Sequence, residues 1–400
     1  MPVCALVNAC FNRGEMFSAR FQWDLKPNRL TQLIERKRRS GTPILDLTES
    51  NPTHAGLSYP EEITQAFEDP RILEYDPEPA GSLEARKAVT DYYEARGQRI
   101  LPGRVLLTAS TSEAYAYLFK LLADPGDEIL VPRPSYPLFE YLAKMESLEA
   151  RQYPLMYHGS WSIDREALER SVTERTKAIV VVNPNNPTGS YVKRGELDAL
   201  IKLASDRKIA LISDEVFADY SLEPACDRVN SLVSVDDCMA FSMSGLSKIA
   251  GLPQMKLGWI VASGPIELRY QAKRKLEWIA DTFLSVGTPV QYAAAKLLSA
   301  GEEVARQIRE RTAANLTWLR QTLAGSAAGV LTVEGGWYAT VQVPKVRSEE
   351  EWALTLLEEH DVLVQPGFFY DFESEAFLVL SLLTQPDVFR QGAARLKGML

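Results

Sequence analysis

A lysine surrounded by small and hydroxyl residues gives the first indication of chemistry in this chain of 400 residues. Lys248 lies among Gly245, Ser247 and Gly251, and Lys256 follows it eight positions later. With so little side-chain bulk nearby, a flat molecule could approach the amine, while the hydroxyl and the second ammonium group could hold an anion. A lysine in this setting can carry an aldehyde cofactor as a Schiff base while its neighbours hold the cofactor's phosphate.

Polar residues also follow two strand-like segments earlier in the chain. Ser110, Thr111 and Ser112 come directly after the segment 105–108 and open a helical stretch. Free backbone N–H groups and hydroxyls at such a turn can bind a phosphate, although the same residues also suit a simple helix cap. After the segment 129–131, a proline-rich loop presents Tyr136, whose ring could stack on a planar cofactor.

Two further strand ends carry an amide and a carboxylate. Asn186 stands in a stretch rich in Asn and Pro that ends at Gly189, and this is the most specific string in the sequence. Held between prolines, its amide could bind the phenolate oxygen of a cofactor ring. Asp214 ends the apolar segment 209–213. Its carboxylate could pair with a pyridinium nitrogen and keep it protonated, which makes the ring an electron sink.

The segments that must position these residues alternate between apolar strands and helical stretches. Because the segment 178–182 is almost continuously apolar, it is typical of a strand buried on both faces. We therefore predict an α/β fold, with a three-layer, mostly parallel sheet that has helices on both faces, and a smaller α+β domain. One long helical region is expected from about residue 267 across Pro289 to residue 323. Ligands of such sheets bind at the carboxyl ends of the strands.

Domain limits follow from these segments. We expect a disordered extension at 1–16, unless Met16 is the true start, and an N-terminal arm with part of the small domain at 17–50. The large cofactor-binding domain is expected at 51–288 and the small C-terminal domain at 289–400.

Composition excludes several classes of partner. The net charge of −9 and the lack of a dense Lys/Arg run argue against nucleic acid, and no apolar run approaches the length of a membrane span. The four scattered cysteines and three histidines provide almost no ligands for a metal site, so no metal is expected. Reduced thiols in a cytoplasmic protein are the favoured interpretation.

Taken in order, these residues resemble the class I and II aminotransferases, which are fold-type I pyridoxal 5′-phosphate (PLP) enzymes, over roughly residues 20–395. The resemblance also includes Trp337, which ends the string Glu-Gly-Gly-Trp. It implies that Lys248 binds the cofactor aldehyde and carries the proton, that Asp214 pairs with the ring nitrogen and that Asn186 pairs with the ring hydroxyl. The remaining implied cofactor contacts are Tyr136 on the ring, Ser110, Thr111, Ser112, Ser247 and Lys256 at the phosphate, and Tyr75 at the phosphate of a partner subunit in a homodimer.

Three positions depart from the family pattern. Phe217 stands where the family has a tyrosine, and Lys256 replaces an arginine that holds the phosphate. Val379 stands where the family has the arginine that binds the substrate α-carboxylate. Another group must then hold the carboxylate, with Arg20 and Arg390 as candidates, or the substrate is not an ordinary α-amino acid.

The expected function is a PLP-dependent aminotransferase that moves an amino group between an amino acid and a 2-oxo acid. The segment between Lys275 and Lys296 has no Arg or Lys to bind a second carboxylate, which favours a neutral or apolar side chain. Four aromatic residues are candidates either for that pocket or for the core: Trp161, Trp337, Phe368 and Phe369. A PLP-dependent lyase, decarboxylase or racemase on the same fold is the alternative, and a binding protein without catalysis is a third reading.

Overall fold

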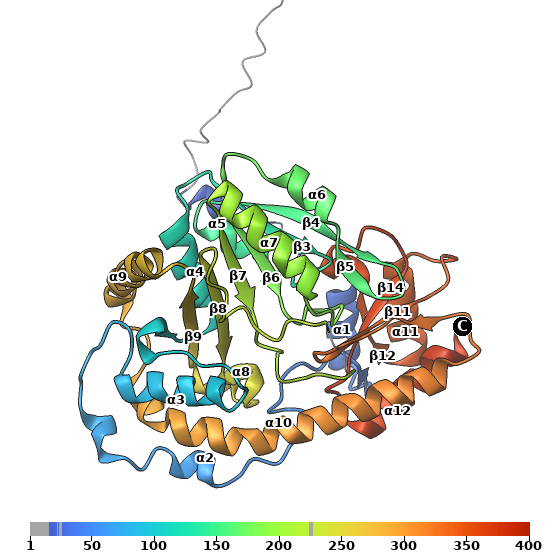
Figure 1. Cartoon of the computed structure of the whole chain (residues 1–400). Helices are drawn as coiled ribbons and strands as arrows, with labels where there is room; N and C mark the ends of the chain where they lie inside the picture. The colour runs from blue at the N-terminus through green and yellow to red at the C-terminus, as the bar shows by residue number, and fades with distance from the viewer. Residues whose placement is uncertain (1–15, 22, 24–25, 224–226) are drawn as a thin grey trace, which may run out of the picture.

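The computed structural model describes residues 16–400, apart from residues 22, 24–25 and 224–226. The extension expected at 1–16 therefore falls, except for Met16, outside the described residues. A sheet of eight strands in the order β2-β9-β8-β7-β6-β3-β4-β5 forms the centre of the protein (Figure 1). The strands are β2 (Val105–Thr108), β3 (Glu128–Arg133), β4 (Glu149–Tyr157), β5 (Trp161–Ile163), β6 (Thr176–Val182), β7 (Ala210–Asp214), β8 (Ala240–Gly245) and β9 (Gly258–Ser263).

Most neighbouring strands of this sheet run parallel. β4, β3, β6, β7 and β8 pair in parallel, whereas β9 pairs antiparallel with both β8 and β2, and β5 pairs antiparallel with β4. Parallel neighbours end at the same edge of a sheet. The loops that follow β3, β6, β7 and β8 therefore open onto one edge, where ligands of this architecture bind.

Helices cover both faces of the sheet because alternate residues of each strand point to opposite sides. Ile212 of β7 packs in one apolar cluster with Ala114 and Leu276, and its neighbour Leu211 packs in another with Leu200. The helices are α3 (Leu83–Glu94), α4 (Thr111–Leu122), α5 (Phe139–Met145), α6 (Arg165–Ser171), α7 (Arg194–Arg207), α8 (Leu246–Ile249) and α9 (Ile266–Phe283).

A smaller α+β region gathers residues from both ends of the chain. Its four strands lie in the order β10-β11-β14-β13, and β1 pairs with β12 beside them. The strands are β1 (Leu45–Asp46), β10 (Gly329–Val330), β11 (Tyr338–Gln342), β12 (Val362–Leu363), β13 (Gln365–Pro366) and β14 (Phe377–Ser381), and the helices are α1 (Arg29–Arg39), α11 (Glu349–His360) and α12 (Pro386–Gly398). The predicted fold class is confirmed, whereas the domain limits stay a prediction.

The helix α10 (Thr288–Leu323) links the two regions, running along the bottom of the molecule from α3 to α12 (Figure 1). The prediction of one helical region across Pro289 is wrong. The helix α9 ends at Leu284 in a left-handed conformation, and Pro289 lies in the first turn of α10. Proline suits a first helical turn, where its missing N–H has no helical partner.

The remaining elements are short: α2 (Glu62–Gln65), η1 (Ala19–Phe21), η2 (Pro70–Leu73), η3 (Pro102–Arg104), η4 (Pro253–Met255) and η5 (Gly367–Tyr370). Among the described residues, no helix combines the length and apolar character that crossing a membrane requires.

Candidate active site

Lys248 lies on α8, the short helix that begins where β8 ends. Its Nζ atom lies 4.9 Å from the ring centre of Trp337 and 5.8 Å from that of Phe217. Burial lowers the pKa of the amine from 10.5 to about 8, against the opposing effect of the Asp214 carboxylate. Since the pKa is close to neutral, a substantial fraction of this amine is uncharged at physiological pH, as a nucleophile or base requires.

Asp214 ends β7, and its carboxylate is buried and held by two donors. The phenol of Tyr115 donates to Oδ2 at 3.1 Å, and the backbone N–H of Val216 donates to Oδ1 at 3.2 Å. Burial raises the pKa of Asp214 from 3.8 to about 6, while Val216, Tyr115 and the charge of Lys248 lower it. The two donors fix the direction of the carboxylate beside the lysine.

The loop after β6 contains three asparagines. The side chains of Asn183 and Asn185 hold the loop together by hydrogen bonds, whereas the side-chain oxygen of Asn186 does not. The amide of Asn183 donates to the Val229 carbonyl at 2.8 Å, and the oxygen of Asn185 accepts from the Ser135 hydroxyl at 2.9 Å. The buried Oδ1 atom of Asn186 has no partner within the described part of the chain. An amide left unpaired in the interior fits a ligand that bonds to it.

Tyr136 follows β3, and 38% of its surface is exposed. Its ring meets the edge of Phe139, with 6.3 Å between the ring centres. Burial raises the pKa of the Tyr136 phenol, and the negative charge of Asp214 raises it further. Tyr136 and Lys248 therefore both lie within electrostatic reach of Asp214.

Ser110 caps α4, and its hydroxyl oxygen accepts from the Glu113 backbone N–H at 3.2 Å. The simpler reading of this residue as a helix cap therefore holds, and the hydroxyl proton is still available to a ligand. Thr111 and Ser112 occupy the first turn of α4, where backbone N–H groups lack helical partners. An anion can bind at this turn.

Lys256 and Ser247 come much later in the chain than that turn. A Cβ atom added to Gly258 would lie 3.2 Å from the backbone of Ser110, so the two segments touch. The side chain of Lys256 is exposed, at a left-handed residue with φ of 52°, and Ser247 of α8 is partly buried. This places Lys256, two residues before Gly258, near the α4 turn in the fold, although the strands β3 to β8 separate the two in sequence.

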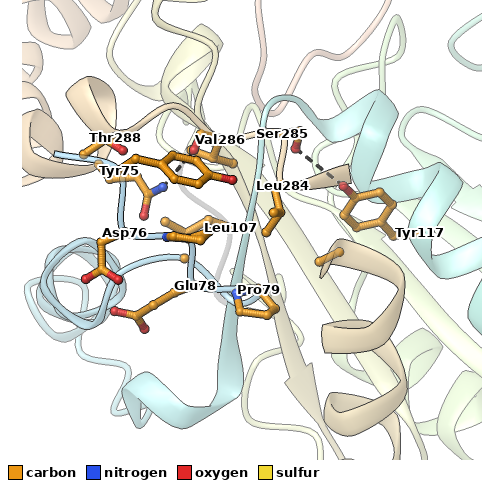
Figure 2. Close-up of a pocket in the computed structure, with 14 residues that line it drawn as sticks. Tyr75, Asp76, Glu78, Pro79, Leu107, Tyr117, Leu284, Ser285, Val286 and Thr288 are labelled. Carbon is orange, nitrogen blue, oxygen red and sulfur yellow. Dashed lines mark hydrogen bonds between the residues drawn. The ribbon is translucent and has the colours of Figure 1, made fainter. Parts of the chain in front are cut away.

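Tyr75 lies apart from these residues, since it lines a different pocket beside the start of α10. Figure 2 shows its ring near Val286 and Thr288, with Leu107 beneath. Tyr75 is 80% exposed and therefore projects toward solvent.

The four aromatic candidates are also dispersed. Trp337 faces Lys248, whereas Trp161 packs against Tyr157 at the far edge of the sheet. Phe368 is 48% exposed, and Phe369 packs against its ring, with 4.8 Å between the ring centres.

Sequence reasoning did not identify Tyr115, although this residue contacts Asp214 directly. Tyr115 lies on the buried face of α4, where an aromatic residue is read as core packing. An N–H or O–H group in an otherwise apolar helix face is a usable signal, because a buried phenol needs a hydrogen-bond partner.

Comparison with known proteins identifies relatives along most of the chain. Residues 42–393 match the family described as aminotransferase class I and II. The glutamate-pyruvate aminotransferase AlaA of Escherichia coli K12 is 28% identical over 261 residues, which are 65% of this chain and 64% of that protein. The alanine aminotransferase of Mycobacterium bovis is 28% identical over 376 residues, 88% of this chain and 84% of its own.

Solved structures show the same fold. The alanine aminotransferase of Pyrococcus furiosus superimposes with a TM-score of 0.84, at 24% identity, covering 92% of this chain and 95% of that chain. An aspartate aminotransferase of Thermus thermophilus, a single mutant, reaches a TM-score of 0.83 over 96% of this chain and 100% of its own, also at 24% identity.

Proposed function

Because residues 42–393 match the class I and II aminotransferases, this chain belongs to that family, and we propose that it is a PLP-dependent aminotransferase. The observation that carries the proposal is the pair formed by Lys248 and Asp214. A buried amine with a pKa of about 8 lies opposite a buried carboxylate at the carboxyl ends of adjacent strands. PLP is the cofactor of this family.

The residues present fit PLP. The unpaired Oδ1 atom of Asn186 could accept a hydrogen bond from the ring hydroxyl, and the carboxylate of Asp214 suits the ring nitrogen. Tyr136 would lie against the ring, and the phosphate would be held by Ser110, Thr111, Ser112, Ser247 and Lys256. When bound, PLP supplies an aldehyde that condenses with amines and a ring that stabilises negative charge on the substrate Cα.

Lys248 would hold PLP through its aldehyde group, and the free amine of Lys248 would take the proton from the substrate Cα. A base with a pKa near the working pH combines a useful neutral fraction with adequate basicity. The rings of Trp337 and Phe217 limit the amine's hydration, which supports the lowered pKa.

Asp214 is proposed to hold the proton on the ring nitrogen. Burial destabilises the ionised form of Asp214, and the hydrogen bonds from Tyr115 and Val216 stabilise that form. Tyr115 acts through Asp214 and is therefore a positioning residue.

A second copy of this chain is the proposed partner. Tyr75 is 80% exposed, and Trp278 on α9 is 74% exposed, which leaves large aromatic surface open to water. A homodimer would cover these rings, and Tyr75 would reach the phosphate in the partner's site.

The proposed substrates belong to the classes of amino acids with neutral or apolar side chains and of 2-oxo acids. The segment 276–295, which contains the start of α10, offers no cation for a second carboxylate. We also propose a cytoplasmic location, since cysteines without paired spacing suit a reducing compartment.

A visible spectrum of the purified protein tests the proposal. We expect a yellow protein whose absorbance band disappears when one class of amino donor is added without an acceptor. A 2-oxo acceptor should then restore the band. A protein that stays colourless when PLP is added would refute the cofactor assignment, and a yellow protein that no amine bleaches would refute transamination.

A further inference from the structure

The strand β14 presents a neutral surface to the Lys248 site. Val379 is fully buried and belongs to the same apolar cluster as Trp337 and Phe217, the two rings beside the lysine. Its neighbours Leu378 and Leu380 belong to the other cluster, in the core of the small domain. Since successive strand residues alternate between faces, Val379 lies on the face toward the active site.

The positions on either side of Val379 are polar but uncharged. In the sheet register, Thr340 of β11 and Gln365 of β13 lie directly opposite Val379 on its two flanks. Directly opposite residues of antiparallel strands share a face, so all three side chains face the same way. The Tyr370 phenol donates to Oε1 of Gln365, which leaves the amide N–H groups of Gln365 as donors.

The hydroxyl of Thr340 is the second observation that points to a ligand. Thr340 is only 1% exposed, and its Oγ1 atom has no hydrogen-bond partner within the described residues. A buried hydroxyl without a partner costs free energy, and a ligand group that bonds to it removes that cost. Thr340 and Gln365 therefore form a small pair of neutral donors around an apolar centre.

Tyr338, two positions before Thr340 on β11, adds a phenol to this face. Burial raises the pKa of Tyr338 to about 12; a hydrogen bond to Ser50 lowers it, while nearby Tyr136 and the Glu49 carboxylate raise it. With a pKa of about 12 the Tyr338 phenol is uncharged at physiological pH, so it supplies no cation for an anionic ligand.

Three arginines that could have supplied a cation for a substrate carboxylate have contacts elsewhere. Arg390 lies over the ring of Trp318, 5.1 Å from its centre, and Arg20 donates to the Met145 carbonyl at 3.0 Å. Arg133, which ends β3, pairs with Glu373. Each of these three guanidinium groups thus has a contact other than Val379, although the buried Nε atom of Arg133 lacks a hydrogen-bond partner within the described residues.

We infer that the subsite formed by Val379, Thr340 and Gln365 binds an uncharged carboxyl derivative of the substrate, an amide or an ester, in preference to a free carboxylate. The inference rests on the proposed function and changes its substrate class from amino acids and 2-oxo acids to their amides or esters, because amino donor and oxo acceptor use the same subsite. A carboxylate would lose its hydration without gaining a cation, whereas a carboxamide loses less and can bond to both neutral donors.

The test compares 2-methylalanine with 2-methylalaninamide, which lack a Cα proton and therefore bind without transamination. Calorimetric titration of the PLP-loaded protein gives both dissociation constants. We expect the amide to bind about tenfold more tightly or better, since an unpaired buried charge is costly. A smaller difference, or tighter binding of the acid, would overturn the inference.

Two variants locate the preference in the structure. Val379→Arg should reverse the order of affinities by supplying the missing cation. Because that buried substitution can disturb folding, Thr340→Val provides a second test: amide binding should weaken by about fivefold, in keeping with one lost neutral hydrogen bond. Thr340→Ser, which keeps the hydroxyl, should bind the amide as the unaltered protein does. Equal amide affinity in Thr340→Val and the unaltered protein would overturn the role of Thr340.

Failure of the inference and failure of the proposed function give different results. If amino acids bleach the visible band and their amides do not, the aminotransferase assignment stands and the neutral subsite is refuted. If neither amino acids nor their amides bleach it, the proposed function itself is refuted.

Discussion

Replacing Tyr115 with phenylalanine tests how the protein keeps a buried carboxylate ionised. The substitution removes only the hydroxyl that donates to Asp214 at 3.1 Å. A hydrogen bond to a charged group contributes about 1.5–3 kcal/mol, which corresponds to about 1–2 pH units at 1.36 kcal/mol per unit. The pKa of Asp214, now about 6, should therefore rise to roughly 7–8 in the cofactor-free variant.

The sign of the effect on stability follows from proton linkage. The pKa of Asp214 is higher in the folded protein than its ordinary value of 3.8, so the folded state binds more protons between these values and stability falls as pH rises through about 6. In Tyr115→Phe this fall should continue to roughly pH 7–8. The stability difference between the two proteins should therefore grow by about 1.5–3 kcal/mol between pH 5 and pH 9.

Urea unfolding of the two cofactor-free proteins at a series of pH values measures this difference. Lys248 and Tyr136 also face Asp214, but both are present in each protein and their contributions largely cancel. Tyr153→Phe is the matched control, because that buried phenol donates to the neutral carbonyl of Val180 at 2.7 Å and its loss should cost the same at every pH. A Tyr115→Phe penalty that is equally flat with pH would refute the reasoning.

Three further outcomes are expected. Lys248→Ala should abolish turnover and the visible band of the bound cofactor. A variant that still turned over substrate would contradict the catalytic role of Lys248. In the unaltered protein, the rate of PLP capture should rise with pH and level off above about 8, where the amine of Lys248 is neutral; a rate still rising at roughly pH 10 would match an ordinary lysine instead. Lys256→Ala should weaken PLP retention by roughly tenfold at most, the effect of losing one exposed charge contact, with little change in turnover at saturating PLP; equilibrium dialysis that shows unchanged affinity would place Lys256 away from the phosphate.

The architecture could be predicted because its signals are local. A strand buried on both faces must be apolar throughout, as in β6, and helices that cover a sheet show helical spacing, as in α7. The break between α9 and α10 was missed because Pro289 is compatible with both a helix interior that bends and a helix start, and only packing distinguishes the two.

The sequence by itself determined the kind of chemistry. A lysine, an aspartate and an asparagine at successive strand ends must converge in a parallel sheet, because parallel strands finish at one edge. It also revealed that a valine stands at position 379.

Only the tertiary structure determined the burial, the pKa values and the neighbours of those residues. The pKa of Lys248 depends on burial and on Asp214, and the pKa of Asp214 depends on burial and on Tyr115, which is far from both in sequence. Likewise, Thr340 and Gln365 flank Val379 solely through the sheet register. Desolvation and cross-strand pairing arise between segments distant in the chain, so no local pattern encodes them.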